Sequence, residues 1–389
     1  MITNIVKGMK IVFFTNCLNH HQIGLADELY HLTAGQYILI ETETLNEERY
    51  KMGFVSYDRP YVLKAYASSE NQRRAFDIAR NFDVAIMGAG SFPYLKVRIK
   101  ERGKLTFSFS ERWLKQGVKN LLSPRLLQQM ILYYLYGRNQ SWYILSASAY
   151  LPYDYNLLRA FRGRCYKWGY FPKVPQGDVN FILSAKRDIE KIKILWVARY
   201  LEWKHPEQMI LLASQLRQYG TDFEINMVGT GDMYEDIEKK ILELNLSDKV
   251  HQLGNLSNSD VIKLMQNHQI FCFTSDRSEG WGAVLGEAMS NACSVVASTA
   301  AGATPFLVQD NINGLLLDLS KKDDLFNKVV KLIENPQMRE SISRNAYYTM
   351  QHLWNPHNAA EKFIQLADSL LQGIECEILD GPCSKAKVL

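Results

Sequence analysis

Long hydrophobic runs and clustered cysteines are both missing from this chain of 389 residues. A bilayer-spanning helix needs about 18 apolar residues in a row, and stretches such as 130–136 reach about half of that length. The six cysteines show neither metal-ligand nor disulfide spacing. We therefore expect no membrane span, no signal peptide and a reduced, cytoplasmic protein whose thiols are buried.

Acidic residues are scarce in one block of the chain. Between Ser91 and Lys173 there are 15 basic and three acidic residues, so this block has a net charge of +12. Because the whole chain has a net charge of +4, the remainder has a net charge of −8. The block also contains clustered apolar residues, namely Leu121, Leu122, Leu126, Leu127, Tyr133, Tyr134 and Tyr136. This composition fits either a solvated basic face over a core helix or a surface for anionic membrane or diphosphate-linked lipid. No nucleic-acid-binding motif accompanies the charge, so nucleic acid is not an expected partner.

Strand patterns alternate with helix patterns in both halves of the chain. Apolar strand-like runs occur at 10–14, 37–40, 84–87, 105–109, 142–146, 193–197, 223–228, 250–253 and 270–274. This alternation predicts the α/β class, with parallel sheets covered by helices on both faces. The Pro/Gly-containing segment 173–178 divides the chain, which predicts two doubly wound Rossmann-like domains at 1–174 and 175–350. A last helix is expected over 351–373, followed by a mobile tail over 374–389.

The stretch Ser275–Met289 (SDRSEGWGAVLGEAM) holds two glutamates, Glu279 and Glu287, with seven residues between them. It follows an apolar run and leads into a helical pattern, so it reads as strand, loop and helix. A helix start presents unpaired backbone N–H groups and the positive end of the helix dipole, which suits a phosphate. Glycines in the loop would let a ligand approach the backbone closely.

This stretch resembles the E-x7-E signature of retaining nucleotide-sugar glycosyltransferases of family 4, whose usual form is EGFG, four residues, then EAM. The segments VARYLEWK (197–204), MVGTGDM (227–233) and 298–318 are similar to further motifs of that family. The sequence departs from the pattern at Ala198, where the family has Gly, and at Phe306, where Glu is common. The resemblance covers about 192–373 and implies the GT-B fold. In that fold two Rossmann-like domains face each other across a cleft, and a C-terminal helix crosses back to the N-terminal domain.

The resemblance also implies roles for single residues. Arg199 and Lys204, expected on an exposed loop, stand where the family places its two diphosphate-binding cations, and Glu279 would contact the sugar or the leaving group. These three are the expected catalytic residues. A carboxylate such as that of Glu287 can accept from both hydroxyls of a ribose. The expected donor-binding set is Gly229, Gly231, Gly254, Asn255, Ser275, Gly280, Gly282, Ala283 and Glu287.

Acceptor contacts are expected from loops that follow strands of the first domain, because ligands of parallel sheets bind beyond the carboxyl ends of the strands. The expected acceptor-binding residues are Asn19, His20, His21, Ser91 and Glu111. No Asp-x-Asp triplet occurs in the sequence. Fixed cations and a helix start would then stabilise the departing diphosphate, so neither a metal nor a cofactor is expected beside the nucleotide-sugar co-substrate.

The resulting expectation is a retaining, metal-independent glycosyltransferase of the hexosyltransferase type. It would move a sugar from a nucleotide-sugar donor, a UDP-sugar rather than a GDP-sugar, to a glycan or lipid-linked acceptor. Its place would be surface polysaccharide or glycolipid biosynthesis at the inner face of the cytoplasmic membrane. Two alternatives remain open, a sugar-nucleotide epimerase of the same fold and a non-catalytic sugar-binding subunit. A nicotinamide enzyme is disfavoured because Gly229-Thr230-Gly231 lacks the third glycine of the dinucleotide fingerprint.

Overall fold

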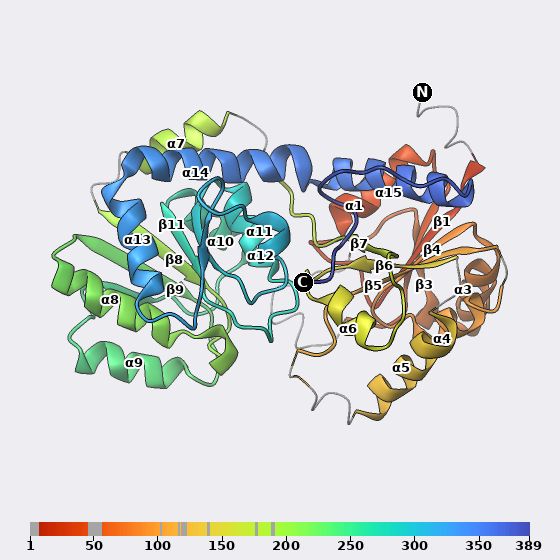
Figure 1. The fold of residues 1–389 in the computed structure, drawn as a ribbon, viewed down its shortest axis with the longest axis horizontal. Coiled ribbons are helices and arrows are strands. Elements are labelled where there is room, and N and C mark those ends of the chain that lie inside the picture. The colour runs from red at the N-terminus through yellow and green to blue at the C-terminus, as the bar shows by residue number, and fades with distance from the viewer. Residues whose placement is uncertain are drawn as a thin grey trace. The chain divides into compact units, whose positions relative to one another are not determined.

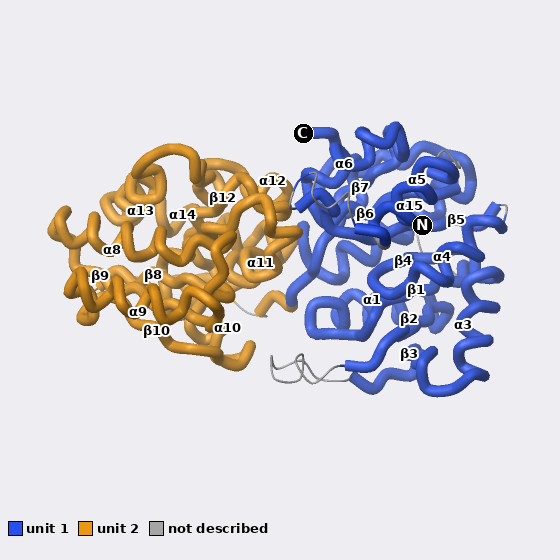
Figure 2. The backbone as a smooth tube through the Cα atoms, turned by 90° about the horizontal axis from the view of Figure 1, so that it is seen from below, with its two compact units in different colours: residues 1–172, 353–389 blue, residues 173–352 orange. Residues whose placement is uncertain are grey.

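The structure, a computed structural model, describes residues 8–45, 57–101, 103–115, 117, 123–137, 141–175, 178–187 and 191–389, apart from the side chain of Arg125. The chain divides into two compact units (Figure 2). Unit 1 comprises Met1–Pro172 and Leu353–Leu389, and unit 2 comprises Lys173–His352. Two residues of the expected linker, Gln176 and Gly177, lie outside the described residues.

Unit 1 contains a parallel sheet of seven strands in the order β3-β2-β1-β4-β5-β6-β7. The strands are β1 (Ile11–Thr15), β2 (Tyr37–Glu41), β3 (Val62–Lys64), β4 (Val84–Met87), β5 (Leu105–Ser110), β6 (Trp142–Ser146) and β7 (Cys165–Lys167). Every residue of β1 is buried. Such a strand reads as a continuous apolar run because both faces of the sheet are covered.

The helices of unit 1 cover the two faces of its sheet (Figure 1). They are α1 (Ile23–Leu32), α3 (Ser69–Asn81), α4 (Phe92–Arg98), α5 (Pro124–Tyr136), α6 (Leu151–Leu157) and α15 (Pro356–Leu371), with the 3-10 turn η3 (Ala65–Ala67). Val12 and Phe14 share one core cluster with buried residues of α3, α4, α5 and α6. On the other face α15 packs against α1. Phe363 of α15 lies edge-on to Phe107 of β5, with ring centroids 5.1 Å apart.

Unit 2 contains a parallel sheet of six strands in the order β10-β9-β8-β11-β12-β13. The strands are β8 (Ile192–Val197), β9 (Phe223–Val228), β10 (Val250–Gln252), β11 (Ile270–Phe273), β12 (Ser294–Ser298) and β13 (Leu315–Leu317). The helices are α7 (Val179–Arg187), α8 (Glu207–Tyr219), α9 (Tyr234–Glu243), α10 (Asn258–Gln266), α11 (Ala283–Ser290), α12 (Thr304–Leu307), α13 (Asp324–Glu334) and α14 (Pro336–Tyr348). Two short turns are η5 (Glu202–Lys204) and η6 (Thr349–Leu353).

These two parallel sheets confirm the expected α/β class. The units divide at residues 172/173 and 352/353, where the sequence predicts 174/175 and 350/351. The last helix belongs to unit 1, since it packs on α1 and β5. Trp354, just before that helix, is fully buried and stacks on Phe171, with ring centroids 6.1 Å apart. The described residues include no helix that is long and apolar enough to cross a membrane.

The tail over residues 374–389, which the sequence predicts to be mobile, has backbone partners in unit 1. The tail runs antiparallel beside β7, and the N–H of Cys383 donates to the carbonyl of Lys167 at 2.8 Å. In return the N–H of Lys167 donates to Ser384 at 2.7 Å, and Ala386 donates to Cys165 at 2.9 Å. An edge strand has unpaired backbone groups, and this tail satisfies those of β7. Helical or strand periodicity cannot reveal such a segment, because its partner lies far away in the sequence.

Candidate functional site

Lys204 and Arg199 lie beyond the carboxyl end of β8, as the sequence predicts. Arg199 is exposed. Lys204 ends the turn η5 and is buried, which corrects the expectation that both cations are exposed. The Lys204 ammonium is hydrogen-bonded to the carboxylate of Glu279, and both side chains are nearly nine-tenths buried. The same ammonium lies 4.3 Å from the ring centroid of Trp203. The structure thus brings two of the three expected catalytic residues into direct contact.

The backbone of the Lys204 loop is held by residues that the sequence reasoning missed. The hydroxyl of Thr274, directly after β11, donates to the carbonyl of Lys204 at 2.6 Å and accepts from the indole N–H of Trp196 at 2.9 Å. The N–H of Asp276 donates to the carbonyl of Trp203 at 2.9 Å. These bonds join the loops after β8 and β11. Their only signal in the sequence is the position of Thr274 at the end of an apolar run.

His205 extends this network beyond the cation. Its Nδ1 lies 2.9 Å from Glu207, and its Nε2 lies 3.6 Å from Asp276. The hydrogen bond with Glu207 raises the pKa of His205. Burial is the next largest effect and acts in the opposite direction. The residue also has a left-handed backbone with φ 52°. These contacts hold His205 between Glu207 and Asp276, directly after Lys204.

The turn from β11 into α11 depends on Gly282, which precedes the helix with φ 90°. A Cβ at this position would lie 2.3 Å from the ring of Phe273, so only glycine fits. Two further hydrogen bonds hold the turn, from Ala303 N–H to Trp281 at 3.1 Å and from Gly302 N–H to Glu279 at 3.4 Å. Gly280 and Ser275 are buried in the same loop, and Ala283 begins the helix. The first N–H groups of α11 therefore follow directly on the Glu279 loop.

Glu287 lies in the second turn of α11 and is buried. The amide of Asn258, the first residue of α10, donates to its carboxylate at 3.3 Å. Burial raises the pKa of Glu287 to about 7, and the bond from Asn258 opposes that rise. The carboxyl group therefore titrates near neutral pH. Asn258 is a second residue that the sequence reasoning missed, although it directly follows the expected donor loop.

The glycine loops after β9 and β10 hold the Arg199 loop in place. The sequence reasoning assigns Gly229 and Gly231 to close approach of a nucleotide. The structure shows a local reason as well, since a Cβ on Gly229 would lie 2.0 Å from the carbonyl oxygen of Ala198. Gly229 N–H donates to Gly254 at 2.8 Å, and the Asn255 amide donates to Thr230 at 2.9 Å. The expected donor residues of unit 2 are thus gathered on adjoining loops beyond the carboxyl ends of its strands.

Three of the expected acceptor residues in unit 1 gather around one tyrosine. The rings of His20 and His21 lie 3.8 Å apart, and His21 lies 5.7 Å from the ring of Tyr170. The hydroxyl of Tyr170 donates to Glu111 at 3.2 Å, and Lys115 forms an ion pair with the same carboxylate. Burial lowers the pKa of both histidines, that of His21 to about 3. Both imidazoles are therefore neutral at pH 7 and act as hydrogen-bonding groups.

Asn19 and Ser91 have local partners instead. The Asn19 side chain accepts from the N–H of His21 at 3.0 Å and donates to Gln22 at 3.3 Å, which fixes the entry into α1. Ser91 is buried, and its hydroxyl donates to the carbonyl of Gly88 at 2.6 Å. The structure therefore gives both residues a role in loop shape, while their contact with an acceptor stays a prediction.

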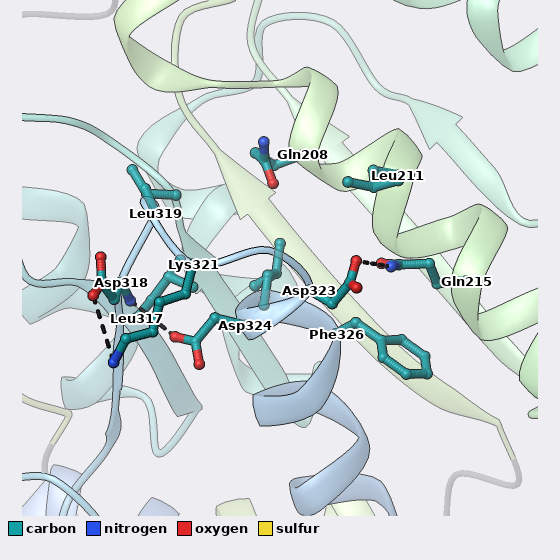
Figure 3. A pocket seen from close by; sticks show the side chains of 11 residues that line it. Gln208, Leu211, Gln215, Leu317, Asp318, Leu319, Lys321, Asp323, Asp324 and Phe326 are labelled. Carbon is teal, nitrogen blue, oxygen red and sulfur yellow. Dashed lines mark hydrogen bonds and ion pairs between the residues drawn. The ribbon is translucent and has the colours of Figure 1, made fainter.

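A small pocket in unit 2 lies between α8 and the start of α13 (Figure 3). Its volume is about 20 Å³, enough for a single water molecule. Asp323 accepts a hydrogen bond from Gln215 at 2.7 Å across it, and Asp318 pairs with Lys321 at 3.6 Å. A nucleotide sugar cannot fit into this space, so the pocket is not the donor site.

Comparison with known proteins finds a family model that matches the segment containing these loops. Residues 182–349 match the family model described as glycosyl transferases group 1. The chain is 34% identical over 124 residues to an uncharacterized glycosyltransferase of Methanocaldococcus jannaschii, covering 32% of this chain and 34% of that protein. It is 27% identical over 185 residues to the alpha-D-kanosaminyltransferase of Streptomyces kanamyceticus, covering 48% of this chain and 45% of that protein. The chain thus matches between a third and a half of the length of these relatives.

Solved structures resemble nearly the whole chain. HepE of Anabaena in complex with UDP is similar with a TM-score of 0.66 and 16% identity, covering 93% of this chain and 100% of HepE. TarM is similar with a TM-score of 0.67 and 12% identity, covering 94% of this chain and 99% of TarM. At such low identity the likeness concerns the fold. Residues 182–349, which make up most of unit 2, thus match the glycosyl transferases group 1 family, and the chain has the fold of the GT-B glycosyltransferases.

Proposed function

We propose that the protein is a retaining glycosyltransferase of the hexosyltransferase type. It transfers a sugar from a nucleotide-sugar donor to a glycan or lipid-linked acceptor without a metal ion. The observation that carries this proposal is the buried contact between Lys204 and Glu279 beside the start of α11, with Glu287 one helical turn further on. These residues lie within the segment that matches the family model. A UDP-sugar is favoured as donor because HepE, of similar fold, is described in complex with UDP-glucose.

The expected chemistry follows from charge. When the bond between sugar and diphosphate breaks, negative charge grows on the diphosphate and must be stabilised. Lys204 and Arg199 supply two cations beyond β8, and the first N–H groups of α11 add the positive end of the helix dipole. Glu287 would accept hydrogen bonds from the ribose hydroxyls. We propose attack from the face that the diphosphate leaves, with the departing phosphate taking the proton of the acceptor hydroxyl.

The acceptor class rests on the relatives. One, from Campylobacter jejuni, is named for transfer onto a sugar-diphospho-undecaprenol, and it is 28% identical over 153 residues, covering 39% of this chain and 40% of that protein. Another, from Bacillus subtilis, is named poly(glycerol-phosphate) alpha-glucosyltransferase. We propose a role in surface polysaccharide or glycolipid biosynthesis, with the protein held peripherally on the cytoplasmic face of an anionic membrane. The loop residues around Tyr170 would contact the acceptor.

The test is slow donor hydrolysis across a panel of UDP-, GDP- and ADP-sugars, with and without excess EDTA. We expect one UDP-sugar to be hydrolysed, EDTA to leave the rate largely unchanged, and Arg199→Ala to lower it by about 10² to 10³. Arg199 is exposed, so this variant should fold. Arg217→Ala on α8, which removes a surface pair with Asp248, is the matched control.

Two results would count against the proposal. Hydrolysis that EDTA abolishes and Mg²⁺ or Mn²⁺ restores would replace the cation mechanism by a metal mechanism. An Arg199→Ala variant within a few-fold of the wild type would remove this residue from the chemistry.

A further inference from the structure

Helix α5 is apolar on the side that faces away from its unit. Its inner side is anchored by Tyr133, which is buried in the core cluster of unit 1. Its outer side consists largely of apolar residues that are at least half exposed, namely Leu127, Ile131, Tyr134 and Leu135. A surface helix normally turns polar residues outward, and a contiguous exposed apolar patch marks an interaction surface. Leu121 and Leu122, also noted in the sequence, lie outside the described residues.

The outer residues of α5 follow the helical repeat. Leu127, Ile131 and Leu135 are spaced by four residues, and Tyr134 lies beside them, so they form one stripe along the helix. Figure 1 shows α5 next to α4 on the side of the sheet opposite α15. The neighbouring helix α6 adds two exposed apolar residues, Tyr153 and Leu157. The two helices contact each other through the rings of Tyr133 and Tyr155, whose centroids lie 5.2 Å apart.

The segment of the chain that carries this surface is strongly basic. From Arg112 to Gly177 the sequence contains ten basic residues and a single acid, Asp154. Asp154 is fully buried, paired with Arg112 at 3.0 Å and hydrogen-bonded by the N–H groups of Trp113 and Leu114. The only carboxylate of this segment is therefore withdrawn from the surface. Exposed cations remain to face a partner.

Two of those cations lie at the carboxyl end of α5. Arg159 and Arg162 are exposed on the loop after α6. Between them, Phe161 donates its N–H to the carbonyl of Gly137, the residue that ends α5, at 3.3 Å. Leucine, isoleucine and tyrosine side chains flanked by arginines, with no acid among them, match the interface of an anionic bilayer. A second copy of the chain would bring like charges together, which disfavours self-association through this surface.

We propose that the outer side of α5, with Tyr153 and Leu157 of α6, docks on an anionic lipid bilayer. Leu127, Ile131 and Leu135 enter the headgroup region, and Arg159 and Arg162 contact lipid phosphates. The inference deepens the proposed function, on which it rests for the lipid-linked acceptor. The binding itself needs no transfer activity, so it can be tested separately from donor hydrolysis.

The experiment is co-sedimentation of the full chain with vesicles of 30% phosphatidylglycerol in phosphatidylcholine, and with pure phosphatidylcholine, at low and high salt. We expect binding to the anionic vesicles that salt weakens. Ile131→Glu and Leu135→Glu should each weaken it by about tenfold or more, because a charge replaces an inserted apolar group. Replacing Arg159 and Arg162 by Gln should weaken it by about fivefold per residue.

The matched control is Leu242→Glu on α9, since Leu242 and Leu135 have nearly equal exposed fractions of 63% and 62%. Melting curves and UDP binding report whether each variant is folded, and Leu135→Gln serves as a milder change. Equal weakening by Leu242→Glu would overturn the proposal, as would a wild type that fails to bind anionic vesicles at low salt. Size-exclusion chromatography that shows a dimer lost on Leu135→Glu would assign the surface to self-association instead.

Discussion

At the scale of single residues, Lys204 has a partner that the donor diphosphate would displace in the proposed function. Its ammonium is hydrogen-bonded to the carboxylate of Glu279. The diphosphate of a nucleotide sugar is expected to need the same ammonium. In the free protein the carboxylate of Glu279 occupies the position beside Lys204 that we assign to the diphosphate. When the diphosphate binds, the Glu279 side chain would leave Lys204 and turn toward the sugar.

Replacing Glu279 by Gln should separate nucleotide binding from transfer. We expect Glu279→Gln to bind UDP about fivefold more tightly, because a neutral amide competes more weakly than a carboxylate for Lys204. Donor hydrolysis should nevertheless fall, since the sugar would lose the carboxylate contact that we propose for it. Isothermal titration with UDP and the hydrolysis assay measure the two effects. Glu202→Gln, an exposed acid in the same turn, is the control. UDP binding that weakens in Glu279→Gln would show that the carboxylate does not compete.

The carboxyl group of Glu287 should make UDP binding depend on pH. Burial raises its pKa to about 7, so the free protein is increasingly protonated below that value. In the proposed function the ribose hydroxyls donate to the ionised carboxylate, so binding at lower pH would first have to remove the proton. Affinity should therefore fall, by at most about tenfold per pH unit, as the pH drops below 7. Titration from pH 5.5 to 8.5 measures this.

UDP itself carries a phosphate that titrates near pH 6, so the variant Glu287→Gln is the reference. The part of the pH dependence that survives in Glu287→Gln belongs to the ligand. An identical profile in wild type and variant would mean that this carboxyl group is not titrating on binding.

At the scale of elements, His268 joins the helix α10 to the strand β9. Its Nδ1 donates to the carbonyl of Leu264 at 2.6 Å, and its Nε2 accepts from the amide of Asn226 at 2.9 Å. The second bond requires the neutral imidazole, because a protonated ring has no acceptor nitrogen. Burial lowers the pKa of His268 to about 4, so the folded chain keeps the ring neutral at pH 7.

His268 should contribute to acid sensitivity. The unfolded chain binds a proton below about pH 6.5 and the folded chain only below about pH 4. The free energy of unfolding that depends on the neutral ring is therefore fully present above pH 6.5. As the pH falls from 6.5 toward 4, this free energy decreases by up to about 1.4 kcal/mol per pH unit. Denaturant unfolding of wild type and His268→Gln between pH 4.5 and 7.5 measures the difference. Curves that stay parallel across this range would contradict the assignment.

The turn between β11 and α11 should tolerate no side chain at Gly282. Gly282→Ala meets both a left-handed backbone and the Phe273 ring, whereas Gly220→Ala, with φ 83°, meets no atom within 4 Å. The control therefore costs about 1 kcal/mol of backbone strain, and Gly282→Ala should cost about 1–3 kcal/mol more from the clash. Thermal melts compare the two variants. Equal losses would show that Phe273 can move aside.

At the scale of the whole molecule, unit 1 is built from both ends of the chain. Its first part ends at Pro172, and the chain returns at Leu353 to add α15 and the tail. The tail then covers the edge of β7 with backbone hydrogen bonds. Unit 1 is therefore complete only when α15 and the tail up to residue 386 are in place.

Truncation should reveal this dependence. A chain ending at Gly373 leaves β7 with an open edge, so we expect a lower melting temperature and aggregation on heating. Removal of residues 387–389 alone, all of them exposed, should leave the melting curve unchanged. Calorimetry and light scattering measure both effects. Equal melting of the long truncation and the full chain would show that the tail adds no stability.

The α/β class, most strands and the stretch Ser275–Met289 could be predicted because each depends on a pattern local to the sequence. Periodicity marks strands and helices, and Glu279 and Glu287 share one loop and helix. The same reasoning did not predict α14, because most of its residues are polar. Its buried apolar residues are Ile342, Ala346 and Tyr347. Its inner side is narrow, so its apolar repeat is weak.

Only the tertiary structure decided which residues meet. The partner of Lys204 lies 75 residues away, and the hydroxyl that holds its carbonyl lies 70 residues away. The tail bonds to a strand more than 200 residues earlier. In α5 apolar residues occur on the inner and the outer side, so the sequence cannot tell the two sides apart. Packing against the sheet buries Tyr133 and leaves Leu135 in solvent. Burial and pairing are properties of neighbours in space, and those neighbours exist only once the chain has folded.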